Sequence, residues 1–382
     1  SSRPTMKAAT TLPFLPVNLM PIIPKHVYGD GQDPKSHPKN SEGVVGSGPF
    51  KLVEFKRDQH VILERYDGFF MEGRPYLDKI VMRIIKDGSA RAIGLENGEL
   101  MLSSFENNVC NINRLKKAVG LVASADGYAA IGPIDWLAFN TKTGKTADKR
   151  VRQAIAYAVD KNFILKAIML GAAEQANAPI HPGSPLSDNT VNAYDLDVAK
   201  ANKILDDAGY AKGDDGMRFK LNIDFGWPAV KPQVEYVKAA LKKVGIDVQV
   251  RASADFPTWA KRMGEMDFDL SWDTVFNWGD PVIGVHRTYL STNIRPVIWS
   301  NTQGYENARV DEVLAMAGSE LDTAARTSLY HEFQQIVGAE LPVYWINALP
   351  YHHAFDDRIG NPPLSIWGMM QSMDEVYWTE DR

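Results

Sequence analysis

The order of apolar and polar residues between 219 and 250 predicts a β-α-β unit. Apolar residues alternate with polar ones over 219–225 and again over 246–250, which is the period of a strand with one buried face. Between these strands, over 234–244, apolar residues recur at the spacing of one helix face, and Gly245 ends the helix. Two strands joined by such a helix run parallel in one sheet, with the helix outside it.

Further elements of both kinds are predicted on either side of this unit. Apolar residues have helical spacing over 148–170, 198–208 and 323–338. The segments 266–272 and 341–345 have the composition and alternation of strands. Helices and strands that follow each other in this way predict an α/β fold.

Near the beginning of the chain, a hairpin is predicted. Two apolar runs, at 50–55 and 61–63, flank the polar turn 56–59. Gly46 and Gly48 precede the first strand and allow a tight turn into it.

Length and charge narrow the class of protein. With 382 residues, the chain is too long for one simple core and predicts about two domains. A hydrophobic content of 45% and a charged content of 23% are typical of a globular protein. The net charge of −5, without a block of Lys and Arg, argues against a nucleic-acid partner.

Cysteine usage and hydropathy argue against a disulfide-stabilised protein, a multi-cysteine metal protein and a membrane-spanning protein. Cys110 is the only cysteine, so neither an intramolecular disulfide nor a multi-cysteine metal site can form. No apolar run approaches the ~20 residues that span a bilayer. The apolar segment 12–23 is interrupted by Pro13, Pro16 and Pro21, so we interpret it as neither a signal sequence nor a membrane helix.

Motifs between residues 44 and 85 resemble those of a known family. Residues 46–50 read GSGPF, 65–70 read RYDGFF and 73–78 read GRPYLD, each leading into or out of a predicted strand. In this order they resemble the signature segment of the extracellular solute-binding proteins, family 5. This is the dipeptide, oligopeptide and nickel type that feeds ABC importers.

Other motifs extend the resemblance along nearly the whole chain. Residues 24–28 (PKHVY), 131–143, 148–154 and 341–345 each resemble a segment of the same family. The resemblance implies a two-lobed, periplasmic binding protein-like α/β fold (type II, cluster C) with a ligand cleft between the lobes. Two crossover strands would connect the lobes.

The resemblance also implies lobe boundaries. We expect residues 1–133 and 346–382 to form the first lobe and 134–345 the second. The motif at 24–28 lies well inside family members, so we expect an N-terminally incomplete first lobe that exposes an apolar surface or sheet edge. A missing N-terminal segment or another chain would cover it. A periplasmic location would then depend on an export signal that is not present in this chain.

The segment Ser271–Pro281, SWDTVFNWGDP, is the first candidate ligand site. In peptide-binding family members, an aspartate near the end of this segment meets the α-amino group of the ligand. Asn277 occupies the best-matching position, and an amide gives no charge–charge attraction. Asp280 or Asp273 could supply the charge instead.

Aromatic residues in the same segment suit stacking against a ligand. Trp272, Phe276 and Trp278 lie within seven residues of each other. Core packing is the alternative role for Trp272 and Trp278, and the sequence leaves both roles open.

Two further groups complete the expected ligand-binding residues. Phe225 and Trp227 lie just past a predicted strand and before a helix, at the edge where ligands of open α/β sheets collect. Capping of the lobe's own core is the alternative role for Trp227. Trp136 and Asn140 on the first crossover strand are a third, weaker candidate.

Motifs for catalysis are not found. The sequence has no G-x-S-x-G, H-E-x-x-H or P-loop motif. His352 and His353 are interpreted as exposed loop residues rather than metal ligands, and no cofactor is expected. The predicted function is capture of a peptide or peptide-like solute for delivery to an ABC permease. The alternatives are a sensing or chaperone-like binding module on the same fold, and a hydrolase.

Overall fold

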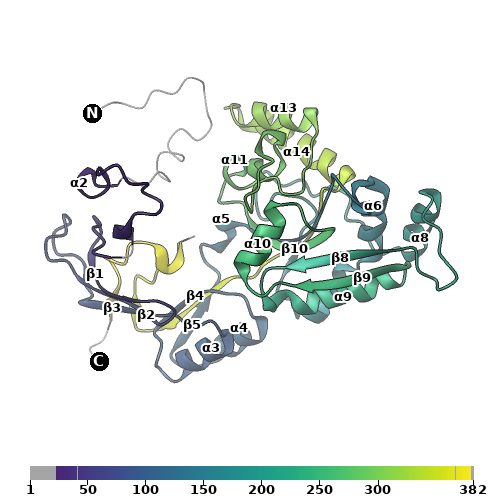
Figure 1. The fold of residues 1–382 in the computed structure, drawn as a ribbon. Coiled ribbons are helices and arrows are strands. Elements are labelled where there is room, and N and C mark those ends of the chain that lie inside the picture. Colours follow the sequence, from purple (N-terminus) through teal and green to yellow (C-terminus); the bar gives the residue numbers. More distant parts are fainter. Residues whose placement is uncertain (1–22, 41, 366, 380–382) are drawn as a thin grey trace. The chain divides into compact units, whose positions relative to one another are not determined.

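The structure is a computed structural model that describes residues 23–40, 42–365 and 367–379 (Figure 1). Segment 12–23, which we interpreted from the sequence as neither a signal sequence nor a membrane helix, therefore lies outside the described residues apart from Ile23. The chain divides into two compact units. The larger unit is Ala129–Pro350, and the smaller unit contains residues 23–128 and 351–379. The expected lobe boundaries at 133/134 and 345/346 stay a prediction.

A six-stranded mixed sheet forms the centre of the larger unit. Its strands lie in the order β7-β11-β6-β10-β8-β9. Their bounds are β6 Pro133–Phe139, β7 Glu174–Gln175, β8 Phe219–Phe225, β9 Ile246–Ala252, β10 Leu270–Phe276 and β11 Val343–Ala348. Strand β8 pairs in parallel with β9 and with β10, while β6 runs antiparallel to β10 and β11. Because helix α9 (Lys231–Lys242) joins β8 to β9, the predicted β-α-β unit is confirmed (Figure 1).

Helices and short helical turns make up much of the rest of the larger unit. These are η2 Lys145–Ala147, α6 Lys149–Ala158, α7 Lys161–Phe163, the π-helical η3 Ile164–Ile168, α8 Val198–Asp207, η4 Pro228–Val230, α10 Phe256–Gly264, α11 Pro281–Gly284, α12 His286–Tyr289, η5 Ser291–Asn293, α13 Ala308–Ala317 and α14 Thr323–Glu340. The short helix α5, Tyr128–Ile131, spans the junction of the two units.

The helical pattern over 148–170 predicted one element, and the structure divides it. Helix α6 ends before Val159, whose backbone is extended, and α7 begins only at Lys161. The Asp160 N–H donates a hydrogen bond of 3.0 Å to the Tyr236 hydroxyl. This side-chain acceptor takes the place of a helical carbonyl, which the local pattern does not reveal.

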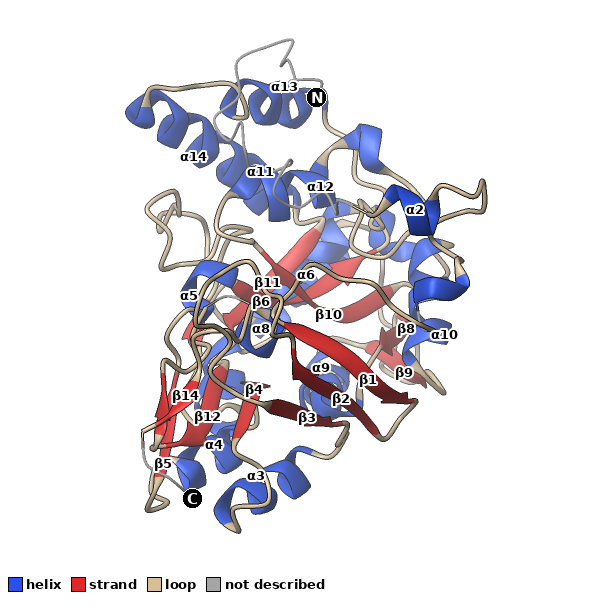
Figure 2. Ribbon diagram, turned by 90° about the vertical axis from the view of Figure 1, so that its left-hand side faces the viewer, coloured by secondary structure: helices blue, strands red, loops and turns tan. Residues whose placement is uncertain are grey.

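The core of the larger unit is built around its sheet. Every residue of β6 and β11 is buried. Three fully buried tryptophans, Trp259, Trp272 and Trp345, are the largest side chains of this core. Figure 2 shows these strands in red among the blue helices that follow them in the chain.

The smaller unit contains two three-stranded sheets and a two-stranded ribbon. The first sheet is the antiparallel meander β1 Phe50–Lys56, β2 His60–Arg65 and β3 Lys79–Arg83. The second has the order β4-β12-β5, and β13 pairs with β14. The remaining bounds are α2 Lys25–Tyr28, η1 Pro38–Asn40, α3 Gly88–Glu96, β4 Leu102–Glu106, α4 Val109–Leu115, β5 Leu121–Ser124, β12 His352–Asp356, β13 Ile359–Gly360, η6 Gly368–Met370 and β14 Tyr377–Trp378.

Two expectations for the smaller unit can be compared with these elements. The hairpin at 50–63 is confirmed as β1 and β2, with a bulge between Leu52 and Glu54. The interpretation of His352 and His353 as exposed loop residues is wrong, because both are buried in β12. Strand β12 is the middle strand of its sheet, and the adjacent histidines therefore lie on opposite faces of that sheet.

None of the helices in the described ranges has both the length and the apolar character that crossing a membrane requires.

Candidate functional site

The candidate site is the edge of the six-stranded sheet at which three parallel strands end. Strands β8, β9 and β10 all point their carboxyl ends to this edge. The segments that follow them begin at Gly226, Ser253 and Asn277. Ligands of open α/β sheets collect at the carboxyl ends of the strands, because the loops there are free to vary.

After β10, the backbone turns through a strained conformation. The N–H groups of Asn277 and Trp278 donate to the carbonyls of Gly132 and Ile131 at 3.2 and 3.0 Å. Trp278 then has φ of +55°, and Gly279 follows with φ of +80°. A bulky residue in the left-handed region costs about 1–2 kcal/mol, and such strain is concentrated at functional sites.

The Trp278 ring is half-buried and contacts Phe276. The two ring centroids lie 5.4 Å apart with the planes at 64°, an edge-to-face arrangement. Both predicted residues therefore keep part of their surface exposed at the carboxyl edge and can stack against a ligand.

The Asn277 side chain holds another segment of the larger unit in place. Its Oδ1 accepts the His181 N–H at 2.7 Å, and its Nδ2 donates to the Pro179 carbonyl at 3.1 Å. The residue is 6% exposed. An amide satisfies both partners because it carries one acceptor and one donor group, whereas a carboxylate would offer two acceptors.

Asp280 is engaged with two partners. Its carboxylate caps helix α11 by accepting the Val282 N–H at 2.9 Å. The Arg326 guanidinium donates to both of its oxygens at 2.8 Å, a bidentate ion pair. The Asp280 carboxylate was a predicted partner for a ligand amine, and it is already paired with Arg326 from α14.

Asp273 lies within the sheet. It is 8% exposed, and its Oδ1 accepts the Thr274 N–H at 2.6 Å. Burial raises the pKa of Asp273 to about 7, although the hydrogen bond from the Thr274 N–H acts in the opposite direction. Asp135, which belongs to the neighbouring strand β6, also has its pKa raised to about 7 by burial.

The other predicted residues pack within the larger unit. Trp272 has no exposed surface, and Trp136 and Phe225 are buried. The Asn140 Nδ2 donates to the carbonyls of Met266 and Phe268 at 2.9 and 3.1 Å, so this side chain ties the end of β6 to the segment before β10. These contacts agree with the core-packing alternative for Trp272, and the binding roles of these residues stay predictions.

Trp227 belongs to an aromatic group whose other members sequence reasoning missed. Its ring contacts Phe256 and Trp259, and Phe256 also contacts Trp299. Phe256 and Trp259 lie at i and i+3 of α10, a spacing that predicts a shared face. Trp299 lies in an irregular loop, where no periodicity points to it.

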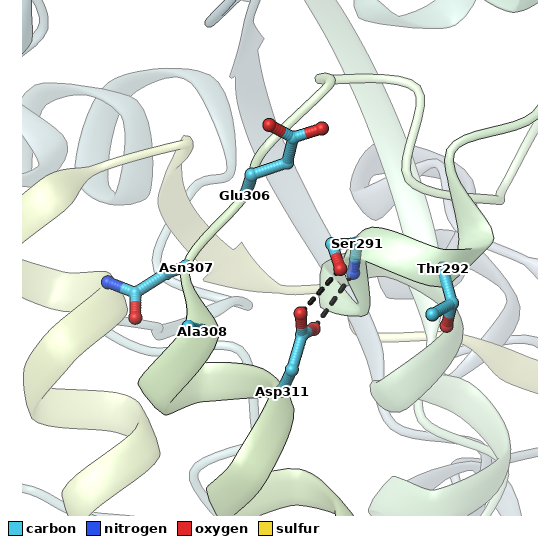
Figure 3. A pocket seen from close by; sticks show the side chains of 6 residues that line it. All are labelled: Ser291, Thr292, Glu306, Asn307, Ala308 and Asp311. Atoms are coloured by element: carbon cyan, nitrogen blue, oxygen red, sulfur yellow. Dashed lines mark hydrogen bonds between the residues drawn. The ribbon is translucent and has the colours of Figure 1, made fainter.

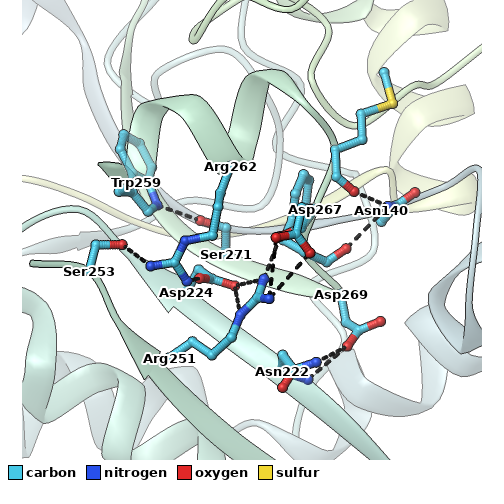
Figure 4. A network of polar contacts seen from close by, with 12 residues as sticks. Asn140, Asn222, Asp224, Arg251, Ser253, Trp259, Arg262, Asp267, Asp269 and Ser271 are labelled. Atoms are coloured by element: carbon cyan, nitrogen blue, oxygen red, sulfur yellow. Dashed lines mark hydrogen bonds and ion pairs between the residues drawn. The ribbon is translucent and has the colours of Figure 1, made fainter. Parts of the chain in front are cut away.

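Charged residues at the same edge neutralise one another. Asp224, which has no exposed surface, is paired with Arg251 on β9 and Arg262 on α10 (Figure 4). The Arg262 Nη2 also donates to the Ser253 hydroxyl at 2.7 Å, and Arg251 reaches Asp267 at 3.2 Å. The network connects the ends of β8 and β9 to α10 and so fixes the edge.

A separate hollow of about 470 Å³ lies where α13 begins. It is lined by Ser291, Thr292, Glu306, Asn307, Ala308 and Asp311 (Figure 3). Asp311 accepts the Ser291 N–H at 2.9 Å and is also bonded to the Ser291 hydroxyl, while Glu306 pairs with Lys142 at 2.7 Å. None of the predicted ligand-binding residues lines this hollow.

Over 23–40, 42–365 and 367–379, no three His, Cys, Asp or Glu residues are grouped so that they could hold a metal ion.

The two compact units and the mixed sheet match the fold of two-lobed α/β binding proteins of the periplasmic type. Residues 3–295 match the family described as "Bacterial extracellular solute-binding proteins, family 5 Middle". The chain therefore belongs to the bacterial extracellular solute-binding proteins of family 5, a family of binding proteins. The resemblance found in the sequence is confirmed.

Relatives differ in what their names say they bind. The chain is 28% identical over 366 residues to the oligopeptide-binding protein AppA of Bacillus subtilis, covering 88% of this chain and 63% of the relative. It is 29% identical over 337 residues to the heme-binding protein A of Haemophilus influenzae, covering 86% of this chain and 57% of the relative. The chain thus spans about three fifths of the length of these relatives.

A solved structure supports the same fold. The periplasmic binding protein DppA of Helicobacter pylori, in complex with the peptide STSA, superposes with a TM-score of 0.76 at 25% identity. The match covers 88% of this chain and 63% of DppA.

Proposed function

We propose that the chain is the substrate-binding part of an ABC import system that captures a peptide or peptide-like solute and delivers it to a membrane permease. The family match over residues 3–295 carries this proposal. Relatives named as oligopeptide- and peptide-binding proteins support the ligand class. The function lies outside the cytoplasm, so the natural protein would be exported.

Among the predicted residues, Trp227, Phe276 and Trp278 are proposed to contact the ligand. Each is half-buried at the carboxyl edge and presents an aromatic ring. Asn277 and Asp280 support them indirectly, because their polar groups are bonded within the larger unit. The two units are proposed as the two lobes of the fold, with a ligand cleft between lobes remaining a prediction.

A second kind of partner is proposed from the smaller unit. Leu52, Leu63 and Ile80 are register partners across β1, β2 and β3, and none of them is buried. An apolar sheet face is ordinarily covered by other parts of the protein or by a partner. An additional polypeptide segment or another chain is proposed to cover it.

Native mass spectrometry of the purified protein tests the ligand class. A retained peptide-like mass, released on denaturation and restored by titration with that compound, is expected. Conversion of the compound into a product would instead support a hydrolase. Genes for a permease and an ATPase beside this gene would favour transport over the sensing alternative.

Ligand binding by the Trp278→Ala variant tests whether Trp278 belongs to the proposed ligand site. Loss of one stacked ring is expected to weaken ligand binding by about 0.5–1.5 kcal/mol beyond the lost buried area. Unchanged calorimetric affinity in this variant would remove Trp278 from the proposed site.

A further inference from the structure

The carboxyl edge of the larger unit carries three aromatic rings from three separate segments. Trp227 follows β8, Phe256 begins α10 just after β9, and Trp299 lies in the loop before α13. We propose that these rings form a subsite for an apolar side chain of the ligand. This inference rests on the proposed function and names the part of a peptide that this edge selects.

The rings form a connected and partly exposed surface. The Trp227 and Phe256 centroids lie 6.3 Å apart with planes at 25°, and those of Phe256 and Trp299 lie 5.9 Å apart at 39°. Phe256 is 39% exposed, while Trp227 and Trp299 are half-buried. Aromatic side chains of this kind have large apolar faces and lose little conformational entropy when a ligand stacks on them.

A buried tryptophan supports the exposed rings from behind. Trp259 has no exposed surface, contacts both Trp227 and Phe256, and donates its indole N–H to the Ser271 hydroxyl at 3.2 Å (Figure 4). A Cβ at Gly226 would lie 2.7 Å from the Trp259 ring. Glycine at this position therefore lets the ring pack on the backbone directly before Trp227, and the surface is fixed before a ligand arrives.

Backbone strain marks the third ring. Trp299 has φ of +61°, in the left-handed region that bulky side chains rarely adopt. Strain of this kind persists where the surroundings impose it, and it is concentrated at ligand clamps. Together with Trp278, the carboxyl edge holds two tryptophans in this conformation.

Charge at the edge selects between the two classes of group that stack on aromatic rings. Rings of this kind accept cations as well as apolar groups. The guanidinium groups of Arg251 and Arg262, both paired with Asp224, lie at this edge (Figure 4). Asp224 and Asp267 are both engaged by these guanidinium groups, so neither carboxylate offers its charge to a lysine or arginine side chain of the ligand. An aromatic or branched aliphatic side chain is therefore the class that fits.

Calorimetric titration with defined peptides tests the subsite. The probes are Ala-Ala-Ala and three variants of it, in which a single Phe replaces the first, the second or the third Ala. At least one Phe peptide is expected to bind the wild-type protein about 2- to 10-fold more tightly than Ala-Ala-Ala, the effect of one aromatic contact. In Phe256→Ala, the ratio between these two affinities is expected to fall to near 1.

Two further variants sharpen the result. Phe256→Leu keeps an apolar side chain at the start of α10 and is expected to retain an intermediate ratio. Phe163→Ala removes a comparably exposed ring, 45% exposed and stacked on Tyr236, from another part of the same unit. The Phe163 variant is expected to keep the wild-type ratio.

The remaining outcomes overturn the inference in distinguishable ways. A preference for Phe peptides that survives in Phe256→Ala would reject the subsite and leave the proposed function standing. Tighter binding of Ala-Lys-Ala than of the Phe peptides, lost in Phe256→Ala, would reject the apolar class. Failure of the wild-type protein to bind any of the peptides would reject the peptide-binding function, and the inference with it.

Discussion

Two sheets of this protein contain strands that mix apolar and polar residues, such as LSWDTVF in β10 and FKLVEFK in β1, but the surroundings of the two sheets are opposite. In the larger unit, all residues of β6 and β11 are buried, as are six of the seven residues of β10. In the smaller unit, no residue of β1, β2 or β3 is buried. Alternation therefore indicates which side chains share a face, but not whether that face is covered.

Part of the difference follows from the connections between the strands. Strands β8 and β9 run parallel, so the chain must return along the sheet between them, and it does so as helix α9. Strands β1, β2 and β3 are antiparallel neighbours whose links contain no helix. The helix that connects two parallel strands packs on one face of their sheet. A meander has no such helix, so its apolar face has to be covered by another part of the polypeptide.

The largest expected effect comes from the core of the six-stranded sheet. Trp272→Ala removes a side chain with no exposed surface and should lower the free energy of unfolding by about 3–5 kcal/mol. Val81→Ala in β3 truncates a residue that is 52% exposed and should lower the free energy of unfolding by less than about 1 kcal/mol. Urea unfolding followed by circular dichroism measures both changes. Equal losses would show that the two sheets do not differ in packing as described.

The next largest effect concerns a buried carboxyl group of the same sheet. Burial raises the pKa of Asp135 to about 7 from its ordinary value of 3.8. Between these two values the folded state holds a proton that the unfolded state has lost, so this group lowers stability as the pH rises. Asp135→Asn should therefore gain stability relative to the wild type by up to about 1.4 kcal/mol for each pH unit between about pH 4 and 7.

Comparison of the variant with the wild type at each pH cancels the titration of groups that do not interact with Asp135, whereas Asp273, whose pKa the Asp135 charge helps to raise, contributes to the difference. His286 and His353, whose pKa values burial lowers to about 4, titrate in both proteins and cancel in the difference. The Asn side chain keeps an acceptor for the Thr274 hydroxyl, which donates to Asp135 at 2.6 Å. A constant difference between the two proteins from pH 4 to 8 would mean that Asp135 is charged in the folded state throughout.

A smaller effect is expected at the loop after β10. Asn277→Asp replaces the amide that donates to the Pro179 carbonyl and leaves a carboxylate facing it. Loss of this buried bond should cost about 1–3 kcal/mol at neutral pH, and less at pH 3, where the new carboxyl group is protonated. Thermal unfolding at the two pH values measures the difference, with Asn277→Ala as the control that lacks a charge.

Ligand titration of the same variant tests the sequence-based hypothesis for this position. The resemblance led to the expectation that a charge at residue 277 would attract a ligand amine. The contacts of Asn277 with Pro179 and His181 instead favour a supporting role. Tighter binding of amine-bearing ligands by a stable Asn277→Asp protein would restore the original hypothesis.

Periodicity predicted the fold well because local alternation and helical spacing are properties of short segments. The β-α-β unit over 219–250 and the hairpin over 50–63 are both present. The division of the 148–170 helix was not predictable, because it depends on the Tyr236 hydroxyl, 76 residues from the Asp160 N–H to which it bonds.

The candidate site was predictable only in part, for the same reason. Motif resemblance pointed to Trp278 and Asn277, and strand-end reasoning pointed to Trp227. The partner of Asn277 at His181 lies 96 residues away, so the sequence could not show that its amide is already engaged. Phe256 and Trp299 come together with Trp227 only in the folded unit, from segments without a common motif.

The smallest effect on stability is expected at the uncovered sheet. Phe55 pairs with Val61, which pairs with Met82, so these three residues extend the apolar face formed by Leu52, Leu63 and Ile80. Phe55 is 48% exposed, and Phe55→Ser should change the free energy of unfolding by less than about 1 kcal/mol. The same variant should lower the binding of a hydrophobic dye and the concentration-dependent association measured by light scattering, because it interrupts an exposed apolar surface. Val81→Ser, on the opposite face at 52% exposure, is the matched control and should reduce both signals less. A loss of several kcal/mol in Phe55→Ser would instead place Phe55 in a packed core, and the contrast between the two sheets would then disappear.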